Sequence, residues 1–547
     1  MSAPARGMRA ALVSPAARSM RRVPVAAWIC AALAIANAVT FSLIVPAFQV
    51  PDEPEHYAYT EFLVQSGRPP YAPPPATEFS PQEQAALEGL YFPTILGGTG
   101  FGRPPWTQTE AAHVRQLLGA SPSLRSQGGV TGESGNPPAY YALEAIPYEI
   151  ASGSSFFDHL EAMRMLSALL FGLTVMFVFG FVRESLREPR WAASAAALAV
   201  AFQPQAAFIA GGVNNDNLMF TAAAALFWLL ARAHRRGMNA RRGAAIGLAL
   251  AIGLLTKLTF IGLLPGVLVA LALIALRQRG RNAVSASDVQ TPDRGETDGI
   301  ERQQSAAARS PLRALSQSVT RMAPATRGLL ASAVVTAIPV AAYVILNTTV
   351  WRRSLFQGAL GTGPVTGTPA SGTASGNFRE LLSYIWQFYL PRLPGMRAQF
   401  SFYPLWHIWF KGFVGDFGLL DYGFANWVYY LAGAIFLMLA ALALRTLVSE
   451  RRSLRSRWPE IVSYGAITIG LLLAIARAGF PYHLQTHFVF EQARYLFPLL
   501  ALYGLFLAVA LRGAGRRWSP ALAGVLVVAM IAHDLFAQLL TLQRYWT

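Results

Sequence analysis

The chain has 547 residues, of which 54% are hydrophobic and 13% are charged, and this composition excludes an ordinary soluble multidomain protein. The net charge of +17 does not indicate a nucleic-acid partner, because the arginines are concentrated in short segments between apolar runs. The one cysteine, Cys30, lies inside the first apolar run, which excludes a disulfide framework and a thiolate metal site.

Apolar runs long enough to cross the hydrocarbon core recur along the chain, and they are continuous rather than alternating, which indicates helices. We therefore predict an all-α polytopic membrane protein with about 11 transmembrane helices. The predicted spans are residues 25–48, 164–183, 192–211, 217–233, 243–257, 259–277, 328–350, 427–446, 460–478, 495–511 and 519–541. The first span follows a basic stretch, as a signal-peptide core does, but its length and the many later spans favour a retained helix.

Arginine clusters define the expected orientation. If the basic N-terminus is cytoplasmic, the clusters "ARAHRRGMNARR" (231–242), "SERRSLRSRW" (449–458) and "RGAGRR" (512–517) all fall on the cytoplasmic side. This is the positive-inside pattern of membrane proteins. It predicts a multi-pass protein of the inner (cytoplasmic) membrane, with the bilayer itself as a partner.

The segments between the spans differ in character. Residues 49–163 and 351–426 are predicted to be large extracytoplasmic loops with short helices, and "FRELLSYIWQFYLPRLPG" in the second has the amphipathic pattern of an interfacial helix. Residues 278–327 have few bulky apolar side chains and are predicted to be a disordered cytoplasmic loop. The expected organisation is a basic N-terminus (1–24), an N-terminal transmembrane module (25–350), the second outer loop (351–426) and C-terminal transmembrane helices (427–547).

The stretch "VPDEPEHYAYT" places three carboxylates and a histidine directly after the first span. Proline and acidic residues favour the first turn of a helix, so a helix is predicted to begin here. On that helix Asp52, His56 and Tyr59 would share one face, whereas Glu53 and Tyr57 would lie on a neighbouring face. An acidic helix cap at the membrane interface explains the stretch equally well, so its function depends on which residues lie near it.

Further polar residues are expected on the same outer side. Asp216 lies in "GGVNNDNLMF", Lys257 in "LLTKLTF", and Arg494 and Tyr495 in "FEQARYLFP". Helix caps and snorkelling anchors are the ordinary explanations, but both cations lie on the side that the positive-inside rule disfavours. The combination suits a lipid-phosphate sugar donor, because a carboxylate can take the proton of an acceptor hydroxyl while Lys and Arg stabilise the departing phosphate.

Six short motifs occur in order along the chain: "PDEPEH", "NPPAYY", "NNDNL", "TK", "WFKGFVGDFG" and "ARYLFP" at 51–56, 136–141, 214–218, 256–257, 409–418 and 493–498. With these motifs the chain resembles the C-type glycosyltransferase (GT-C) superfamily, integral membrane enzymes that use polyprenyl-phosphate-linked sugars. The closer resemblance is to a largely uncharacterised bacterial membrane-protein branch of it. This implies a GT-C-like fold and transfer of a sugar at the extracytoplasmic face to a cell-envelope glycan, lipid or protein.

The resemblance also implies roles for individual residues. The implied general base is Asp52, with Glu53 supporting it or binding a cation and His56 orienting it or bonding locally. The implied contacts to the donor phosphate are Lys257, Arg494 and Tyr495. The implied substrate-binding residues are Tyr57, Asn136, Tyr140, Asp216, Trp409 and Asp416. No cofactor is certain, and a divalent cation stays an open question because the sequence shows no tight set of ligands.

Two other functions are considered. A transporter or flippase of lipid-linked saccharides would need ionisable residues along the middle of several spans, and apart from His533 and Asp534 these are nearly absent. A non-enzymatic scaffold for envelope synthesis could retain the same motifs. Because the polar residues gather on one outer face, an enzyme is the preferred hypothesis.

Overall fold

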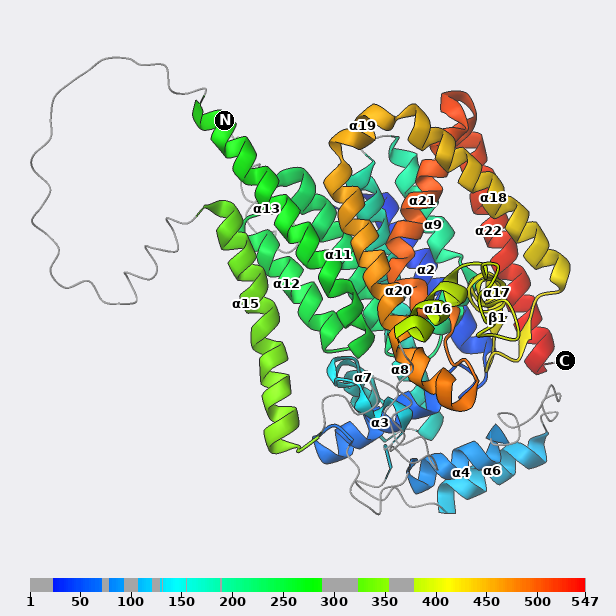
Figure 1. The fold of residues 1–547 in the computed structure, drawn as a ribbon. Helices are drawn as coiled ribbons and strands as arrows, with labels where there is room; N and C mark the ends of the chain where they lie inside the picture. Colours follow the sequence, from blue (N-terminus) through cyan, green and yellow to red (C-terminus); the bar gives the residue numbers. More distant parts are fainter. Residues whose placement is uncertain are drawn as a thin grey trace, which may run out of the picture.

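The computed structural model describes residues 23–70, 78–92, 107–120, 128–129, 131–153, 155–186, 189–287, 323–353 and 378–546. Long helices form a bundle, and shorter helices gather beyond one end of it (Figure 1). The long helices and their continuations are α2 (Val25–Ile44), α8 (Phe156–Ser185), α9 (Arg190–Ala201) with α10 (Pro204–Ala210), α11 (Asp216–Arg236), α12 (Ala240–Leu254), η2 (Leu258–Leu263) with α13 (Leu264–Ser287), α15 (Pro324–Ile345) with η3 (Leu346–Val350), α18 (Asn426–Ser449), α20 (Trp458–Thr486), η5 (Ala493–Leu499) with α21 (Leu500–Gly513), and α22 (Gly515–Trp546).

The shorter elements belong to the segments between the spans. Those that follow α2 are α3 (Glu53–Ser66), α4 (Pro81–Gly89), α6 (Gln108–Ala120), η1 (Gly132–Gly135) and α7 (Ala139–Ile150). Those that precede α18 are α16 (Phe378–Tyr389), η4 (Leu405–Phe410), α17 (Lys411–Gly415) and the antiparallel pair β1 (Asp416–Phe417) and β2 (Tyr422–Gly423). The turn α19 (Arg451–Ser456) joins α18 to α20.

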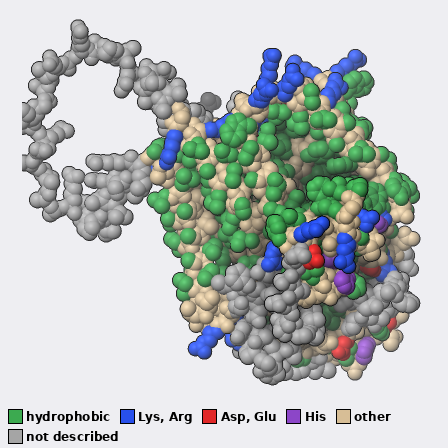
Figure 2. Space-filling model, in the orientation of Figure 1, with side chains coloured by type: hydrophobic (Ala, Val, Ile, Leu, Met, Phe, Trp, Pro, Cys, Tyr) green, Lys and Arg blue, Asp and Glu red, His purple; other side chains and the backbone are tan. Residues whose placement is uncertain are grey.

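The all-α membrane class is confirmed. Within the described ranges, eight helices are long and apolar enough to cross a membrane, and the bent pair α9 and α10 raises the number to nine. The remaining predicted spans are also helical: α11 packs against α8 and α12, and α12 packs against α15. The predicted number of about 11 therefore exceeds what length and apolarity alone support, since α12 has only 15 residues and a spanning helix needs about 20. Figure 2 shows a broad hydrophobic surface over the helices.

Several predicted boundaries differ from the structure. The first helix ends at Ile44 rather than at residue 48, because Val45 is extended and a proline follows it. Helix α8 begins at Phe156 rather than at residue 164, because Ser155 and Asp158 form a capping box that starts the helix earlier. Helix α13 continues to Ser287, so the start of the loop predicted at 278–327 is helical. Residues 1–22 of the predicted basic N-terminus, 288–322 of that loop and the linker at 354–377 lie outside the described residues, whereas 324–327 already belong to α15.

The amphipathic stretch in the second outer segment forms α16, as predicted. Its buried side chains are Tyr384, Gln387 and Phe388, and the helix packs against α20. The Tyr384 hydroxyl donates to Glu491 Oε1 at 3.1 Å. This contact ties α16 to the chain that enters η5.

A break between α9 and α10 brings polar residues close to α3. The two helices meet at an angle of 62°, and Pro204 begins the second of them. After α10 the chain passes Gly212, where a Cβ atom would lie only 2.6 Å from the side chain of Val50. Only glycine allows this close approach, which lets the turn before Asp216 lie against the end of the first span.

A buried ion pair joins the start of α3 to α8. The Nε and Nη2 groups of Arg164 donate to the Glu53 carboxylate at 2.8 and 2.6 Å, and Glu53 is fully buried. The same guanidinium donates to the backbone carbonyls of Ser42, Val45 and Pro46 at 2.9 to 3.0 Å. Glu53 also accepts the backbone N–H groups of Phe48 and Val213, at 2.8 and 3.0 Å. The pair therefore holds together α3, α8, the end of α2 and the turn before α11.

We predict that breaking this pair destabilises the whole protein. Arg164→Met or Glu53→Gln leaves a charged partner buried without compensation, which costs about 3–5 kcal/mol. Thermal unfolding of the purified, detergent-solubilised protein measures the effect as a lower Tm. Arg190→Gln is the control, because Arg190 is exposed at the start of α9. Unchanged Tm values in both pair variants would show that the pair contributes no net stability.

A second group of buried carboxyls lies where α3 meets α4. Glu61 is 4% exposed and Glu83 is fully buried, and no hydrogen-bond partner reaches either carboxyl oxygen of Glu83 in the described structure. Burial raises the pKa of Glu61 to about 7. Burial, together with the charge of Glu61, raises the pKa of Glu83 well above its usual value. Glu83 is thus held in the neutral form, whereas Glu61 is about half protonated at pH 7.

We predict a pH-dependent contribution of Glu61 to stability. The folded protein keeps this proton up to about pH 7, whereas the unfolded chain releases it near its ordinary pKa of 4.5. The folded state then binds more protons, so the contribution is complete below about pH 4.5 and is lost as the pH rises to about 7, amounting to about 3 kcal/mol at most. Unfolding followed from pH 5 to 8 should show a smaller decline in Glu61→Gln than in wild type. Equal declines in Glu61→Gln and in the exposed control Glu88→Gln would contradict this.

Candidate functional site

Asp52 does not lie on a helix, contrary to the prediction. Helix α3 begins at Glu53, and Asp52 precedes it with φ of 62° and ψ of 12°, in the left-handed region that Asp adopts more readily than most residues. The adjacent carboxylates of Asp52 and Glu53 therefore diverge. Glu53 turns to Arg164, whereas Asp52 forms an ion pair with Arg494 and keeps 35% of its side chain exposed.

Asp216 holds both predicted phosphate-binding cations. It is the first residue of α11, where the helix dipole favours a negative charge, and its side chain is fully buried. Lys257 Nζ lies 2.8 Å from Oδ1, and Arg494 Nε lies 3.6 Å from Oδ2. Because Arg494 also contacts Asp52, it links the two carboxylates.

Tyr495 supports the same two cations. The Nζ atom of Lys257 lies 5.4 Å from the centre of the Tyr495 ring, and the guanidinium carbon of Arg494 lies 5.5 Å from it. Both distances fall within the range of cation–π attraction. The structure thus brings Asp52, Asp216, Lys257, Arg494 and Tyr495 together from four separate parts of the chain.

Glu133 joins this group, although the sequence analysis did not identify it. Its Oε2 atom lies 4.0 Å from Nδ1 of His56, and it accepts a 3.3 Å hydrogen bond from Nδ2 of Asn215. Asn136 also donates its side-chain amide to Glu133. The only signal in the sequence is one acid in "TGESG", immediately before the "NPPAYY" motif.

His56 is held by the aromatic residues of α7. Its Nδ1 lies 3.0 Å from the hydroxyl of Tyr141, and its ring is fully buried. The hydroxyl of Tyr141 also accepts from Nδ2 of Asn215 at 3.2 Å. Nε2 of His56 has no hydrogen-bond partner within the described residues. A buried ring nitrogen without a partner is uncommon and indicates a place for a ligand atom.

The charges set the protonation states of the site. Burial raises the pKa of the Asp52 carboxyl, but the positive charges of Arg494 and Lys257 outweigh this, and the pKa lies below its usual value. Burial raises the pKa of Glu133 to about 7. Burial lowers the pKa of His56 well below its usual value, so the imidazole is neutral at neutral pH. Asp52 is therefore ionised, and Glu133 is the carboxyl closest to half-protonation.

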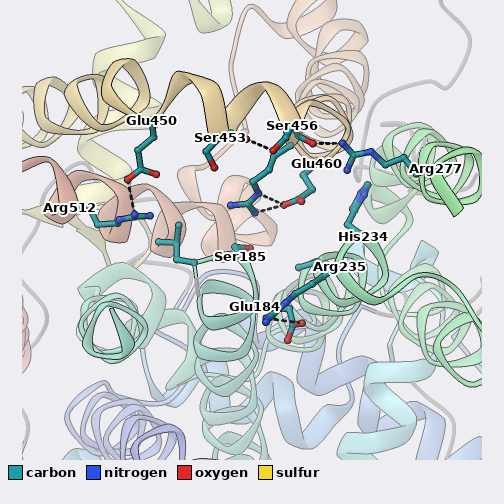
Figure 3. Close-up of a pocket in the computed structure, with 13 residues that line it drawn as sticks. Glu184, Ser185, His234, Arg235, Arg277, Glu450, Ser453, Ser456, Glu460 and Arg512 are labelled. Atoms are coloured by element: carbon teal, nitrogen blue, oxygen red, sulfur yellow. Dashed lines mark hydrogen bonds and ion pairs between the residues drawn. The ribbon is translucent and has the colours of Figure 1, made fainter. Parts of the chain in front are cut away.

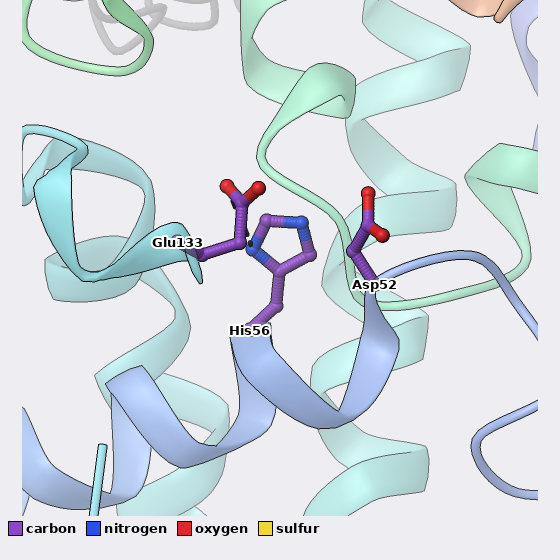
Figure 4. A group of neighbouring side chains, drawn as sticks. All are labelled: Asp52, His56 and Glu133. Carbon is purple, nitrogen blue, oxygen red and sulfur yellow. Dashed lines mark ion pairs between the residues drawn. The ribbon is translucent and has the colours of Figure 1, made fainter. Parts of the chain in front are cut away.

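Asp52, His56 and Glu133 fit a divalent cation. One ligand atom from each lies within 4.8 Å of the other two. Figure 4 shows the Glu133 side chain beside the imidazole of His56, with Asp52 approaching from the start of α3. A neutral imidazole with two carboxylates is a donor set that Zn²⁺ and Mn²⁺ accept, and the unpartnered Nε2 of His56 is available for coordination.

Other residues predicted for the site lie elsewhere. Tyr57 packs in the aromatic core against Phe48 and Phe156, with ring centres 5.9 and 4.9 Å away. Trp409 donates its indole N–H to the carbonyl of Phe388 at 2.9 Å, in the aromatic cluster under α16. Both side chains thus pack among aromatic rings, and a substrate contact by either stays a prediction.

Tyr140, Asp416 and the pair in the last helix have structural contacts of their own. The Tyr140 hydroxyl accepts the backbone N–H of Asn214 at 2.8 Å, which supports the turn before Asp216. The backbone N–H of Asp416 donates to Oε1 of Gln205 at 2.9 Å, and burial raises the pKa of this carboxyl to about 6. Asp534, beside His533 in α22, accepts a 2.9 Å hydrogen bond from Gln538, which also donates to Asn37 of α2.

Comparisons with solved structures give weak similarities. The chain is 14% identical to the apo oligosaccharyltransferase of Archaeoglobus fulgidus. The match covers 95% of this chain and 56% of that chain, with a TM-score of 0.41. For the archaeal oligosaccharyltransferase AglB from the same organism, in complex with an inhibitory peptide and a dolichol-phosphate, the identity is 13%, the coverage is 94% and 56%, and the TM-score is 0.39. The chain thus spans about half the length of these structures.

The family comparison covers most of the chain. No curated protein gives a significant match. Residues 35–503, which include every residue of the cluster described above, match the family described as Predicted membrane protein (DUF2142). The protein belongs to this DUF2142 family of predicted membrane proteins.

Proposed function

We propose that the protein is a GT-C-type membrane glycosyltransferase that moves a sugar from a polyprenyl-phosphate-linked donor to a cell-envelope acceptor at the extracytoplasmic face. The observation that supports this most is the convergence of Lys257 and Arg494 beside the ionised carboxylate of Asp52. The cluster lies at the end of the bundle where α3 and α7 pack, among residues predicted to face outward.

In the proposed transfer, the Asp52 carboxylate and the two cations have different roles. Asp52 accepts the proton of an acceptor hydroxyl, whose oxygen attacks the anomeric carbon of the donor sugar. The bond between that carbon and the phosphate oxygen breaks, and Lys257 and Arg494 stabilise the departing polyprenyl phosphate. Attack opposite the leaving group inverts the configuration at the anomeric carbon.

The ion pair between Asp52 and Arg494 links donor binding to this chemistry. In the structure, Arg494 weakens the basicity of Asp52 because it stabilises the ionised form. A donor phosphate competes for the same guanidinium and so withdraws part of that stabilisation. Asp52 then becomes a better base at the moment when the acceptor must lose its proton. Glu53 has a positioning role, since Arg164 engages it away from the cluster.

The charge balance favours a divalent cation in addition. The two cations are already neutralised by Asp52 and Asp216, so a donor phosphate adds uncompensated negative charge. The residues that would hold a cation are Asp52, His56 and Glu133. When bound, it would supply positive charge for the donor phosphate. The assays below are therefore run with Mn²⁺ or Mg²⁺ and repeated with a chelator.

We predict that Asp52→Asn lowers transfer by about 10²–10⁴-fold, the usual contribution of a general base, with Tm near wild type and donor binding no weaker, because Arg494 loses a competing carboxylate. Release of polyprenyl phosphate from a panel of polyprenyl-phosphate hexoses and pentoses, with envelope extracts as acceptor, measures the rate. Glu149→Gln, an exposed acid on α7, is the control. Full activity in Asp52→Asn would remove Asp52 from the reaction. Absence of transfer by the wild type from every donor would overturn the proposed function.

We predict that Lys257→Gln weakens binding of polyprenyl phosphate about tenfold or more, because a charge-assisted contact to the phosphate is lost. Binding of the uncharged polyprenol should be unchanged. Titration of both lipids into the detergent-solubilised protein gives the comparison. Lys257→Arg keeps the charge beside Asp216 and controls for instability, and Lys411→Gln removes a cation from outside the cluster. Equal loss of polyprenol binding would contradict a phosphate contact.

A further inference from the structure

A polar pocket lies at the opposite end of the bundle from Asp52. Helix α11 begins at Asp216 in the cluster described above and places Arg235 about 30 Å away, at 1.5 Å per residue. There the ends of several helices surround a cavity of about 760 Å³ (Figure 3). Its charged and histidine lining residues are Glu184, His234, Arg235, Arg277, Glu450, Arg457, Glu460 and Arg512.

The arginines of this pocket are not all neutralised. Each carboxylate holds a guanidinium: Glu184 lies 3.3 Å from Arg235, Glu450 lies 2.7 Å from Arg512, and Glu460 accepts from Nε of Arg457 at 3.1 Å. Arg277 instead donates to the backbone carbonyl of Ser456. Among the described residues, Arg277 is thus the arginine of the pocket without a carboxylate partner. Because Glu184 also pairs with Arg236 at 3.1 Å, the arginines around the pocket carry at least one uncompensated positive charge.

His234 adds an unsatisfied acceptor to the same wall. The residue is 5% exposed, and its Nε2 lies 3.2 Å from Oγ of Ser463. Ser463 donates its own hydroxyl hydrogen to the carbonyl of Pro459 at 2.6 Å. The hydrogen between Ser463 and His234 must therefore come from Nε2, which leaves Nδ1 as an acceptor. Within the described residues no donor reaches this Nδ1 atom.

The two unmatched groups require different features of one ligand. Arg277 favours an anion, and a phosphate ester suits a guanidinium in both charge and geometry. Nδ1 of His234 favours a hydroxyl donor. Figure 3 shows His234 and Arg277 on the same side of the pocket. A cavity of about 760 Å³ is much larger than one phosphate and lies within the usual range of small-molecule sites, roughly 300–1,000 Å³.

We propose that this pocket binds a hydroxylated phosphate ester, namely the glycerol phosphate headgroup of an anionic phospholipid such as phosphatidylglycerol. The phosphate contacts Arg277, and a headgroup hydroxyl donates to His234. The pocket lies at the arginine-rich end of the bundle, which is predicted to be cytoplasmic, and Lys and Arg side chains gather over that end in Figure 2. Anionic headgroups accumulate at such surfaces. This site is independent of the proposed glycosyltransferase function.

Lipid binding to the full-length protein tests the proposal. The wild type is placed in phosphatidylcholine nanodiscs with increasing phosphatidylglycerol, and bound lipid is counted by native mass spectrometry. Arg277→Gln should weaken phosphatidylglycerol binding about tenfold, the usual effect of losing one charge-assisted hydrogen bond. Arg455→Gln, an exposed arginine of α19 outside the pocket, should leave it unchanged. Equal weakening in both variants would reduce the effect to general surface attraction and overturn the proposal.

Further experiments identify the ligand and distinguish loss of binding from misfolding. Phosphatidylpropanol carries the same single phosphodiester charge as phosphatidylglycerol but has no headgroup hydroxyl, so the wild type should prefer phosphatidylglycerol and His234→Phe should lose that preference. No preference in the wild type would overturn the hydroxyl assignment. Competition by soluble glycerol 1-phosphate that depends on Arg277 would support the pocket but identify a free phosphate ester as its ligand. Arg277→Lys retains the charge and should bind better than Arg277→Gln; equal loss in a well-folded pair would contradict the phosphate contact.

Discussion

The buried ion pair between Glu53 and Arg164 is the contact on which the arrangement around α3 depends. All five N–H donors of the guanidinium are used, two on the carboxylate and three on backbone carbonyls at the end of the first span. The carboxylate in turn accepts two backbone N–H groups, one of them from Val213. A buried charge pair is retained at low cost only when such additional hydrogen bonds satisfy both partners.

This pair also determines how the neighbouring acid can act. Glu53 is held against α8, and Asp52 beside it takes a left-handed conformation that directs its carboxylate to Arg494 instead. The bond from Val213 to Glu53 fixes the turn that leads to Asp216. One structural carboxylate thus positions two others, and both of these meet Arg494.

The two ends of the bundle differ in their charge balance. At the cluster around Asp52 and Asp216, two cations face two buried or half-buried carboxylates, so an anionic substrate must displace an ion pair or arrive with a cation. At the opposite end, each carboxylate already holds an arginine and one arginine is left over. The first arrangement suits a reaction in which charge moves, whereas the second suits stable retention of an anion.

The sequence by itself determined the membrane class, the approximate positions of the long helices and the occurrence of polar motifs beside apolar runs. The length of an apolar run can be read from the sequence, and the thickness of the hydrocarbon core fixes how long a spanning helix must be. The positions of the arginines between the runs predict the orientation of the spans. The sequence also singled out Asp52, Asp216, Lys257, Arg494 and Tyr495, because charge beside an apolar run is visible without knowledge of contacts. Their catalytic and binding roles stay predictions.

Only the tertiary structure decided which of the neighbouring residues face the cluster. Helical periodicity grouped Asp52 with His56, and one ligand atom of each does lie within 4.8 Å of the other. The left-handed conformation of Asp52 and the pairing of Glu53 with Arg164, more than a hundred residues away, could not be read from a local pattern. Glu133 enters through contacts with His56 and Asn215, each about eighty residues distant, and no local pattern reports such contacts. Tyr57 and Trp409 belong to predicted motifs yet pack in aromatic cores. Burial of their rings is favourable, and a short motif does not show which of its side chains will be buried.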